Sequence, residues 1–325
     1  MTLPKEASAL VHTPGDNSLH LETLHIPSPA QGDDHLIRVR AVAITNGELA
    51  WPEPASQQIP IPGYEVAGTV VVAPPESPYA PGAEVYARTA FDRQGSARIF
   101  TIARTAELAL KPRNLSWEEA ATVPLSALTA WQALFVHGGL TPPGVSGAGE
   151  ANAGKRLLVT AAAGGVGIWA VQLARSSGIH VVGTSGASNL EFVRQLGADD
   201  VLDYKNLDLA LWAAARPDQR FDLVLDCVGG PTLKAAWACA APGGLVISVA
   251  LPAHLQRPAT GVADGVRSLW FIVDADSSQL NKITRLIEDG SALAFYDSAF
   301  DLEDYGQAFD RVRGGHLRGK VVLRL

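Results

Sequence analysis

A long apolar stretch in the middle of the chain predicts a strand, a helix and a second strand in succession. Residues 156–160 form a short apolar run that is typical of a buried strand. Residues 168–177 continue as an apolar helix that ends at Gly178, and residues 179–184 are apolar again. Two strands joined by a helix in this way lie parallel in one sheet. We therefore expect the core of an α/β domain here.

Glycine is concentrated where the first of these strands meets the helix. The turn Ala162-Ala163-Gly164-Gly165-Val166-Gly167 matches the dinucleotide-binding fingerprint, with an alanine in the first glycine position. Backbone N–H groups in such a turn can approach a pyrophosphate, and the positive end of the helix dipole favours the anion. One alternative is a packed Gly/Ala helix that binds nothing. The other is a membrane span over 157–174, which the glycine turn would break, so we expect no span.

Short segments rich in apolar residues precede this unit and predict a small β domain. Residues 35–43 alternate apolar and charged side chains, as a strand with one solvated face does. Residues 45–51 are expected to form a loop or a short helix, and the Pro-rich residues 52–62 an irregular segment. The other predicted strands lie at 9–12, 19–24, within 61–72, at 84–87 and at 97–102. Many short strands divided by Gly and Pro are typical of a compact barrel-like domain.

Helical patterns begin near residue 115. Ser116 and Glu119 form a capping box, and residues 125–136 predict a second helix. Residues 138–154 are too rich in Gly and Pro for a regular element and are expected to form a loop. After residue 185, strands predicted at 200–202, 221–226, 244–249 and 269–273 alternate with helices at 191–196, 233–240 and 278–288. This alternation predicts a doubly wound parallel sheet.

Length and the last segments of the chain indicate two domains. A chain of 325 residues is long for one domain. Residues 299–301 and 320–325 return to β character and should rejoin the first domain. We therefore predict an α/β protein with a β-barrel domain at 1–124 and 295–325 and a nucleotide-binding domain at 125–294.

Charge and cysteine content exclude several classes of protein. A net charge of −7 argues against non-specific nucleic-acid binding. Two cysteines, Cys227 and Cys239, cannot build a disulfide scaffold and are expected to be small buried side chains. The first residues lack a basic region followed by an apolar core, so we expect no secretory signal, no membrane association and a cytoplasmic protein.

The end of the second strand of the central unit bears on the choice of dinucleotide. Enzymes that use NAD usually carry an acidic residue there, which binds the ribose 2′-OH. This strand ends Gly183-Thr184-Ser185-Gly186, with no acidic residue before Glu191. Because a carboxylate would repel a 2′-phosphate, its absence favours NADPH. Candidate cationic partners of that phosphate are Arg194 and Lys205, which can equally be solvated surface charges.

Several stretches together resemble the medium-chain dehydrogenase/reductase superfamily, in its zinc-independent branch of quinone oxidoreductase-like and enoyl reductase-like enzymes. The matching stretches are 61–70 (IPGYEVAGTV), 115–134 (LSWEEAATVPLSALTAWQAL), 159–174 (VTAAAGGVGIWAVQLA), 196–204 (LGADDVLDY), 221–230 (FDLVLDCVGG) and 314–323 (GGHLRGKVVL). The resemblance implies a discontinuous GroES-like β-barrel catalytic domain and a Rossmann nucleotide-binding domain, with the cofactor in the cleft between them.

Departures from the zinc-dependent relatives bear on the chemistry. Those relatives hold catalytic zinc with a Cys where this chain has Thr45 and a His where it has Tyr64. Hydroxyl groups are poor zinc ligands, and the four-cysteine structural lobe is missing, so we expect no metal. Without a Lewis acid, alcohol–ketone interconversion is disfavoured, and hydride transfer to a conjugated C=C bond or a quinone is favoured. The developing oxyanion then needs only hydrogen-bond donors.

The resemblance also implies roles for single residues. Thr45 and Tyr64 are candidates for the group that protonates the enolate or binds its oxygen, and solvent is the alternative. Glu48 and Glu65 are expected to be structural, and Trp51 and the loop 251–265 to contribute to the substrate pocket. The implied cofactor contacts are Gly164, Gly165, Val166 and Gly167 at the pyrophosphate, Ser185 and Tyr204 at the phosphorylated ribose, and Asn46, Thr129, Phe271, Ile272 and Val273 near the nicotinamide.

The expected protein is thus an NADPH-dependent reductase of a small-molecule enone, enoyl thioester or quinone. Two other hypotheses stay open at this point. One is an enoyl reductase that acts in trans on a polyketide or fatty-acid synthase. The other is a protein that binds NADPH without catalysis. The resemblance further implies a homodimer through the sheet edge at 269–273.

Overall fold

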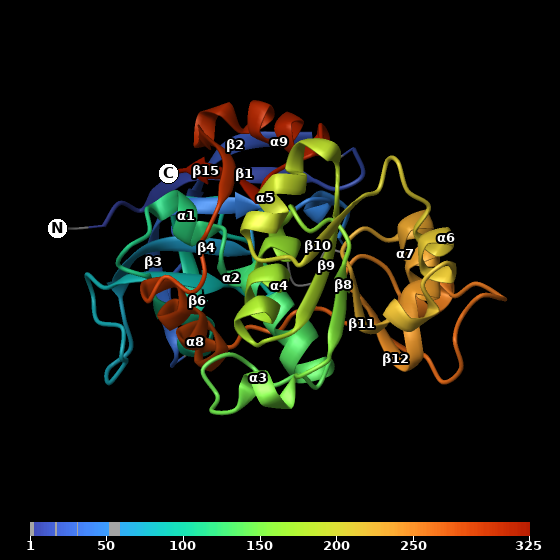
Figure 1. Cartoon of the computed structure of the whole chain (residues 1–325). Coiled ribbons are helices and arrows are strands. Elements are labelled where there is room, and N and C mark those ends of the chain that lie inside the picture. Colours follow the sequence, from blue (N-terminus) through green and yellow to red (C-terminus); the bar gives the residue numbers. More distant parts are fainter. Residues whose placement is uncertain (1–2, 17, 31, 52–58) are drawn as a thin grey trace. The chain divides into compact units, whose positions relative to one another are not determined.

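The computed structural model describes residues 3–16, 18–30, 32–51 and 59–325, and Figure 1 shows the chain. The chain forms two compact units. Unit 1 combines the residues up to Leu128 with Asp274–Leu325, and unit 2 is Thr129–Val273. We expected residues 274–294 in the nucleotide-binding domain, but they belong to unit 1. They do so because α8 (Ser277–Glu288) packs in unit 1, where the Thr284 hydroxyl lies 2.7 Å from the hydroxyl of Tyr86.

Unit 2 contains the predicted doubly wound sheet. Its strands run in the order β10-β9-β8-β11-β12-β13, and every neighbouring pair is parallel. Figure 1 shows α4 (Gly165–Ser176) and α5 (Leu190–Gln195) on one side of this sheet and α6 (Leu209–Ala214) and α7 (Gly230–Ala236) on the other. The strands are β8 (Arg156–Val159), β9 (His180–Ser185), β10 (Asp200–Asp203), β11 (Phe221–Asp226), β12 (Ala240–Ser248) and β13 (Arg267–Trp270). This arrangement confirms the α/β fold class.

Helices join these strands. They are α3 (Ala148–Ala151), α4 (Gly165–Ser176), α5 (Leu190–Gln195), α6 (Leu209–Ala214) and α7 (Gly230–Ala236), with short 3₁₀ turns at Ala187–Asn189, Pro217–Gln219, Trp237–Cys239 and Ala253–Gln256. Trp237 and Phe221 are completely buried and anchor the core between the sheet and α6 and α7. Two expectations need correction. The loop predicted at 138–154 contains the single helical turn α3, and the strand predicted at 269–273 ends at Trp270.

Unit 1 is built on a sheet that connects distant parts of the chain. Within the described residues its strands run in the order β14-β15-β3-β4-β5-β7, and β6 also pairs with β3. The strands are β3 (Asp34–Ile44), β4 (Glu65–Val72), β5 (Glu84–Arg88), β6 (Phe100–Arg104), β7 (Leu108–Leu110), β14 (Tyr296–Asp301) and β15 (Lys320–Arg324). A separate antiparallel pair is formed by β1 (Glu6–Thr13) and β2 (Ser18–His25). The last segments of the chain therefore rejoin the first β segments, as expected.

The helices of unit 1 follow the sequence pattern only in part. Ser116 caps α1 (Trp117–Ala121) in the predicted capping box with Glu119. The predicted helix at 125–136 is α2 (Pro124–Trp131), which continues into unit 2 as a π-helical segment, Gln132–His137. One further helix, α9 (Tyr305–Arg313), was not among the helices predicted from the sequence. Short 3₁₀ turns lie at Glu48–Ala50 (η1), Thr105–Glu107 and Leu302–Asp304. Most of the irregular segment predicted at 52–62 lies outside the described residues.

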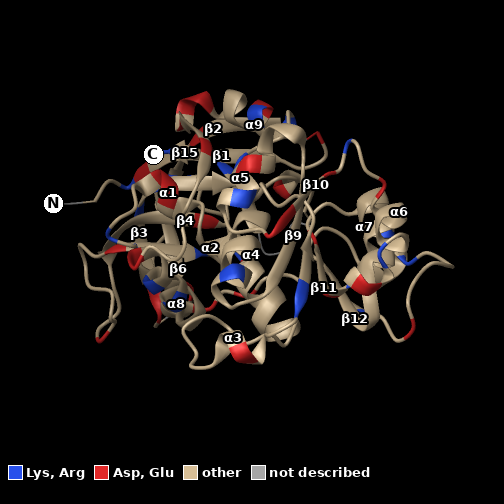
Figure 2. Ribbon diagram, in the orientation of Figure 1, with Lys and Arg blue, Asp and Glu red and all other residues tan. Residues whose placement is uncertain are grey.

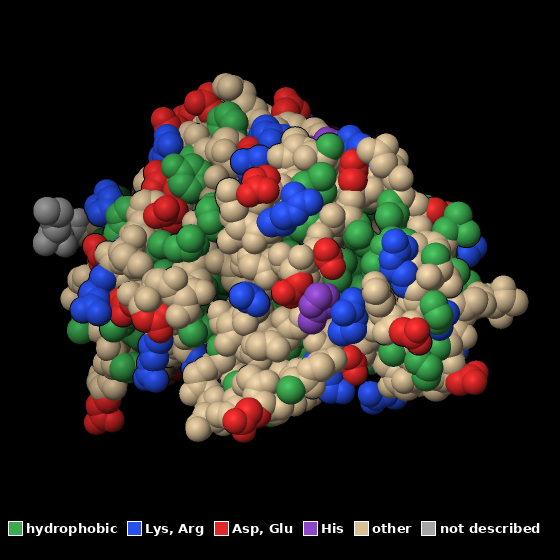
Figure 3. Space-filling view, in the orientation of Figure 1, with side chains coloured by type: hydrophobic (Ala, Val, Ile, Leu, Met, Phe, Trp, Pro, Cys, Tyr) green, Lys and Arg blue, Asp and Glu red, His purple; other side chains and the backbone are tan. Residues whose placement is uncertain are grey.

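The apolar stretch at 157–174 folds as β8, the glycine turn and the first part of α4. Among the helices that the structure describes, none combines the length and hydrophobicity needed to cross a membrane. Figure 2 shows acidic and basic residues spread over many elements of the chain. On the face drawn in Figure 3, blue and red side chains are likewise interspersed. This distribution agrees with the small negative net charge.

Candidate functional site

The glycine turn of unit 2 has the close packing that the fingerprint requires. A Cβ atom on Gly167 would lie 2.3 Å from the carbonyl oxygen of Ala161, so only glycine fits where α4 approaches the strand. Gly164 is the N-cap of α4 and leaves the first backbone N–H groups of the helix without a side-chain cap. Ala162, in the first glycine position, lies against Gly183 of β9, where a Cβ atom would come within 2.8 Å of the alanine methyl group. The turn therefore fits a pyrophosphate at the helix N-terminus.

The end of β9 lies beside the residue after β10. The backbone N–H of Tyr204 donates to the carbonyl oxygen of Ser185, and the Tyr204 ring lies 3.8 Å from where a Cβ atom of Gly186 would be. Tyr204 is 46% exposed, whereas Ser185 is buried and its hydroxyl donates to the carbonyl oxygen of Gly186. An exposed aromatic ring and a segment without acidic residues thus adjoin each other at the edge where a bound adenosine ribose is expected.

The two candidate cations differ in their surroundings. Arg194 lies 3.6 Å from the carboxylate of Glu191, one helical turn away on α5. Lys205 follows Tyr204 directly and is exposed, and its ammonium group makes no ion pair within the described residues. Lys205 is therefore the better candidate to bind a 2′-phosphate.

A buried carboxylate that the sequence analysis did not select ties three strands together. Asp226, at the carboxyl end of β11, accepts hydrogen bonds from the Thr160 hydroxyl at 2.9 Å, the Gly229 N–H at 2.8 Å and the Ser248 hydroxyl at 3.1 Å. Its side chain is completely buried. The sequence feature that could have identified Asp226 is its place as an acidic residue at the carboxyl end of an otherwise apolar strand. That end of each strand faces the ligand in a doubly wound sheet. Asp226 fixes the carboxyl ends of β8, β11 and β12 beside the glycine turn.

The residues implied at the nicotinamide lie in three places. Asn46 is exposed in the loop after β3, followed by Gly47 with a left-handed φ of 79°. Thr129 is buried in α2. Phe271, Ile272 and Val273 follow the end of β13 instead of forming its strand, because the pairing with β12 stops at Trp270. The Phe271 ring packs at 4.5 Å from the ring of His137, and Ile272 is 57% exposed.

Strand register in unit 1 gathers three polar side chains. β15 pairs with β3 so that Val321 lies opposite Ile44, and one further step brings Lys320 opposite Thr45. β3 pairs with β4 so that Val42 lies opposite Val66, and one further step brings Glu65 opposite residue 43, on the same face as Thr45. The Lys320 ammonium donates to the Thr45 hydroxyl oxygen at 2.7 Å and forms an ion pair with Glu65.

The surroundings of this triad hold it in place. The other carboxylate oxygen of Glu65 accepts the N–H of Leu125 at 3.1 Å. Gly319, just before Lys320, has a left-handed φ of 76°, and a Cβ atom there would lie 2.3 Å from the Phe295 carbonyl oxygen. Glu65 is fully buried and Lys320 is 6% exposed, whereas Thr45 is half-buried. Thr45 is thus the member of the triad that reaches the surface of the unit.

A second carboxyl group lies near the triad. Glu48, in η1 after β3, is buried, and neither of its carboxyl oxygens completes a well-aligned hydrogen bond within the described residues. Burial raises the pKa of Glu48 to about 8, although the charge of Lys320 and the backbone groups of Thr45 and Gly63 favour the ionised form. Burial also raises the pKa of Glu65, against the opposing effect of Lys320. Glu48 is therefore mostly uncharged at neutral pH.

Tyr64 lies in an aromatic cluster. Its ring packs edge-on against Phe91 at 4.6 Å between centroids and lies 6.1 Å from the ring of Trp51. Trp51 in turn packs edge-on against Phe91 at 5.1 Å, and the Arg88 guanidinium lies 4.2 Å from the centre of the Phe91 ring. Burial lowers the pKa of Arg88 to about 10, so it remains a cation. Trp51 and Phe91 are half-buried and present aromatic surface.

The donors at the ends of β3 and β4 do not fit a zinc ion. Zinc prefers thiolate, imidazole and carboxylate ligands, whereas Thr45 and Tyr64 offer hydroxyl groups. The adjacent carboxylate, Glu65, is already neutralised by Lys320, whose positive charge would repel a second cation. Among the residues with described positions, no three His, Cys, Asp or Glu side chains gather in a group that could hold a metal ion.

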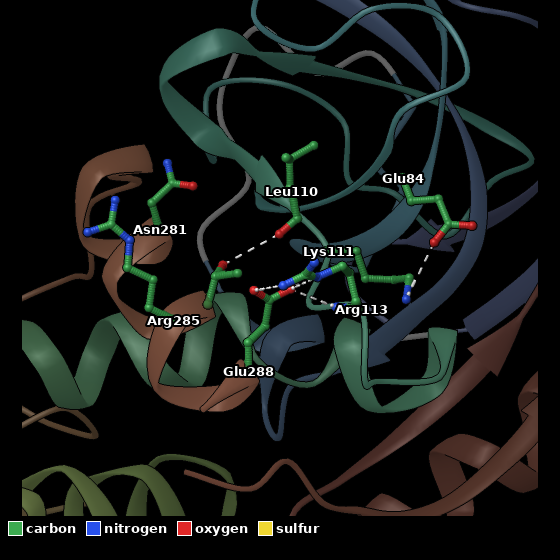
Figure 4. A pocket seen from close by; sticks show the side chains of 8 residues that line it. Glu84, Leu110, Lys111, Arg113, Asn281, Arg285 and Glu288 are labelled. Carbon is green, nitrogen blue, oxygen red and sulfur yellow. Dashed lines mark hydrogen bonds and ion pairs between the residues drawn. The ribbon is translucent and has the colours of Figure 1, made fainter. Parts of the chain in front are cut away.

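A hollow on the surface of unit 1 does not add chemistry to the site. It has a volume of about 460 Å³ and lies between α8 and the segment that follows β7 (Figure 4). Arg113 pairs with Glu288 across it, and Lys111 lies 3.5 Å from Glu84. The Arg113–Glu288 pair joins α8 to the segment after β7, and the hydroxyl of Thr284 on α8 also donates to the carbonyl oxygen of Leu110 in β7.

Comparisons with known proteins agree with this architecture. Residues 196–323 match a family model described as zinc-binding dehydrogenase. The chain is 44% identical to the probable zinc-binding oxidoreductase, mitochondrial, of Arthroderma benhamiae, over 100% of this chain and 98% of that protein. It is 32% identical to the NAD(P)H oxidoreductase RTN4IP1, mitochondrial, of Bos taurus, over 81% of this chain and 70% of that protein. The structure of a quinone oxidoreductase from Coxiella burnetii superimposes with a TM-score of 0.83 at 23% identity, over 99% of this chain and 100% of that one.

These names correct one expectation. We expected a cytoplasmic protein from the absence of a secretory pattern, but both of these relatives are named mitochondrial. The absence of a secretory signal does not exclude a mitochondrial location, because a secretory signal is only one kind of targeting segment.

Proposed function

Because the chain belongs to the medium-chain dehydrogenase/reductase superfamily, as a quinone oxidoreductase-like member, we propose that it is a zinc-free, NADPH-dependent reductase of conjugated enones or quinones. Membership makes it an oxidoreductase that uses a nicotinamide cofactor. The choice of NADPH, the independence from zinc and the class of acceptor are our proposals. The observations on unit 1 and unit 2 support them separately.

The observation that carries the proposal is the set of donors at the ends of β3 and β4. Thr45 presents a hydroxyl group backed by the buried Lys320 ammonium, in place of a thiolate. A hydroxyl donor suits an oxygen atom that becomes negative during reduction. Tyr64, Trp51 and Phe91 add aromatic surface in the same unit, which favours a flat conjugated acceptor over a saturated alcohol.

Preference for NADPH rests on the end of β9. The residues after Thr184 carry no carboxylate before Glu191, which would repel a 2′-phosphate, and the exposed Lys205 can pair with one. Tyr204 offers an exposed ring beside Gly186 for the ribose end of the cofactor. These features fit NADPH better than NADH.

The roles of the chain's own residues follow. The bound nicotinamide supplies a hydride. The glycine turn from Gly164 to Gly167 binds the pyrophosphate through backbone N–H groups. Thr45 donates a hydrogen bond to the acceptor oxygen as negative charge develops there. Tyr64 is packed on two sides by aromatic rings, so it shapes the pocket, and Thr45 is the better candidate of the two for binding the oxygen.

The test is a survey of acceptors with both nicotinamide cofactors. Oxidation of NADPH and of NADH is followed at 340 nm with an alkyl enone, an ortho-quinone, a para-quinone and a crotonyl thioester. We expect consumption of NADPH with an enone or a quinone. Exclusive use of the thioester would favour the enoyl reductase hypothesis, and tight NADPH binding without turnover of any acceptor would favour a non-catalytic binding protein.

A further inference from the structure

Lys320 is the one cation in the buried triad, and its position suggests a role beyond stability. It donates to Thr45 at 2.7 Å and is neutralised by Glu65. A buried ion pair is weak grounds for stability by itself, because desolvation offsets most of the Coulomb gain. Stability alone therefore does not explain why the Lys320 ammonium lies directly behind the half-buried Thr45 hydroxyl.

We propose that Lys320 is a positioning residue that makes the Thr45 hydroxyl a directed, polarised donor to the oxygen of the acceptor, in the place where zinc-dependent relatives have a metal. This inference rests on the proposed function. The Thr45 oxygen accepts from Lys320, so the hydroxyl hydrogen points to another group. The structure gives this hydrogen no acceptor within the described part of the chain. An incoming oxygen atom is the partner that completes the chain of hydrogen bonds.

Charge around Thr45 suits this role. Glu65 holds Lys320 and takes its other hydrogen bond from Leu125, so the carboxylate is fixed and does not compete for Thr45. Glu48 is mostly uncharged at neutral pH, so the cluster carries one positive and one negative charge. The charged groups acting on Glu48 are Lys320 and Glu65. Ionisation of Glu48 would make the cluster negative and oppose an oxyanion at Thr45.

The reduction consumes one hydride and one proton for each acceptor molecule. Reduction adds one hydride to one end of the conjugated system, and the π electron pair moves to the carbonyl oxygen. The Thr45 hydroxyl donates a hydrogen bond to that oxygen while the charge develops, and Lys320 keeps its proton and its ion pair with Glu65. The reduced acceptor then takes one proton from water. The sum is one acceptor, one NADPH and one proton converted into the reduced acceptor and NADP⁺.

A cycle of variants in the full chain tests the inference. Thr45→Val removes the donor, and Thr45→Ser keeps it as a matched control. The pair Glu65→Gln with Lys320→Met removes both buried charges together, so no uncompensated charge remains to unfold the chain. We expect Thr45→Val and the neutral pair each to lower kcat about 100-fold, with the dissociation constant of NADPH unchanged. The kcat of Thr45→Ser should stay within about threefold of that of the unchanged chain.

The triple variant separates a positioning role from a structural one. This variant combines Thr45→Val with the neutral pair Glu65→Gln and Lys320→Met. If Lys320 acts through Thr45, the triple variant loses no more activity than Thr45→Val alone. Additive losses, or a folded neutral pair with unchanged kcat, would overturn the inference. Circular dichroism confirms folding of each variant.

A binding probe separates this inference from the proposed function. The ionisation of bound 4-nitrophenol, an oxyanion mimic, is measured by absorbance in the presence of NADP⁺. We expect the unchanged chain to lower the pKa of the bound phenol and the neutral pair to lose this effect. If the chain ionises the phenol in this way but turns over no acceptor, the proposed reductase function is refuted and the role of Lys320 stands. If the chain turns over a quinone and the neutral pair does so at the same rate, the reductase function stands and the role of Lys320 is refuted. If the chain neither turns over an acceptor nor ionises the phenol, both are refuted.

Discussion

At the scale of single residues, Glu48 links the site to the stability of the fold. Folding removes its carboxyl group from water, and burial raises its pKa from 4.5 to about 8. Between these values the folded state binds a proton that the unfolded state has released. The contribution of Glu48 to the free energy of unfolding therefore falls as the pH rises from about 4.5 to about 8.

Replacement of this carboxyl group should remove that pH dependence. We expect Glu48→Gln to stabilise the chain little at pH 5 and increasingly up to pH 9, by at most about 5 kcal/mol, because glutamine is not ionised. Urea denaturation at each pH measures the difference, and Glu191→Gln on the exposed face of α5 is the control. A difference that does not grow with pH would contradict the assignment of a raised pKa to Glu48.

We propose that Lys205 decides the preference for NADPH over NADH. Lys205→Ala should weaken NADPH binding about tenfold and leave NADH binding within about twofold, because only NADPH carries the 2′-phosphate. Titration of each cofactor by fluorescence measures both constants. Arg194→Ala is the matched control, since Arg194 is already paired with Glu191. Equal weakening of both cofactors, or of neither, would show that Lys205 does not contact the phosphate.

At the scale of elements, local sequence patterns predicted individual helices and strands, whereas contacts that depend on strand pairing between distant segments were not predicted. The strand, turn and helix from β8 to α4 followed from an apolar period and a glycine cluster that lie within thirty residues of each other. The short helix α9 was missed because its polar sequence hid the apolar face formed by Ala308, Phe309 and Val312. The Lys320–Thr45 contact joins residues 275 positions apart, so no local pattern contains it. Only the register of β15 against β3 brings them together.

Asp226 offers a test of how the strand ends of unit 2 are held. Asp226→Ala should lower the free energy of unfolding by about 3–5 kcal/mol, because three buried donors lose their acceptor. Ser248→Ala, which removes one of these donors, should lower it by about 1 kcal/mol. Urea denaturation compares the two variants. A loss below about 1 kcal/mol for Asp226→Ala would show that the network does not hold the strands.

At the scale of the whole molecule, the edge of the unit 2 sheet predicts assembly. Within the described residues β13 pairs on one side only, with β12. Trp270 at the end of β13 and Ile272, two residues after it, are 42% and 57% exposed. An exposed strand edge with apolar side chains is a template for pairing with another chain. We propose a homodimer through this edge.

Light scattering tests this proposal. We expect a mass of twice 34.2 kDa at micromolar concentration for the unchanged chain. The variant with Trp270→Glu and Ile272→Glu should have the mass of a monomer, because charges on the edge oppose pairing. Leu211→Glu on α6, where Leu211 is 70% exposed, is the control and should stay dimeric. A monomeric unchanged chain, or a dimeric double variant, would exclude this interface.

We propose that this oxidoreductase reduces conjugated acceptors with NADPH and without zinc. The most direct measurement is the rate of NADPH oxidation with a para-quinone and an alkyl enone. It is made on protein whose metal content has been measured after exhaustive chelation. We predict an unchanged rate in metal-depleted protein, with NADPH preferred over NADH. A rate that vanishes on chelation and returns with zinc, or oxidation of a simple alcohol in place of acceptor reduction, would contradict the account.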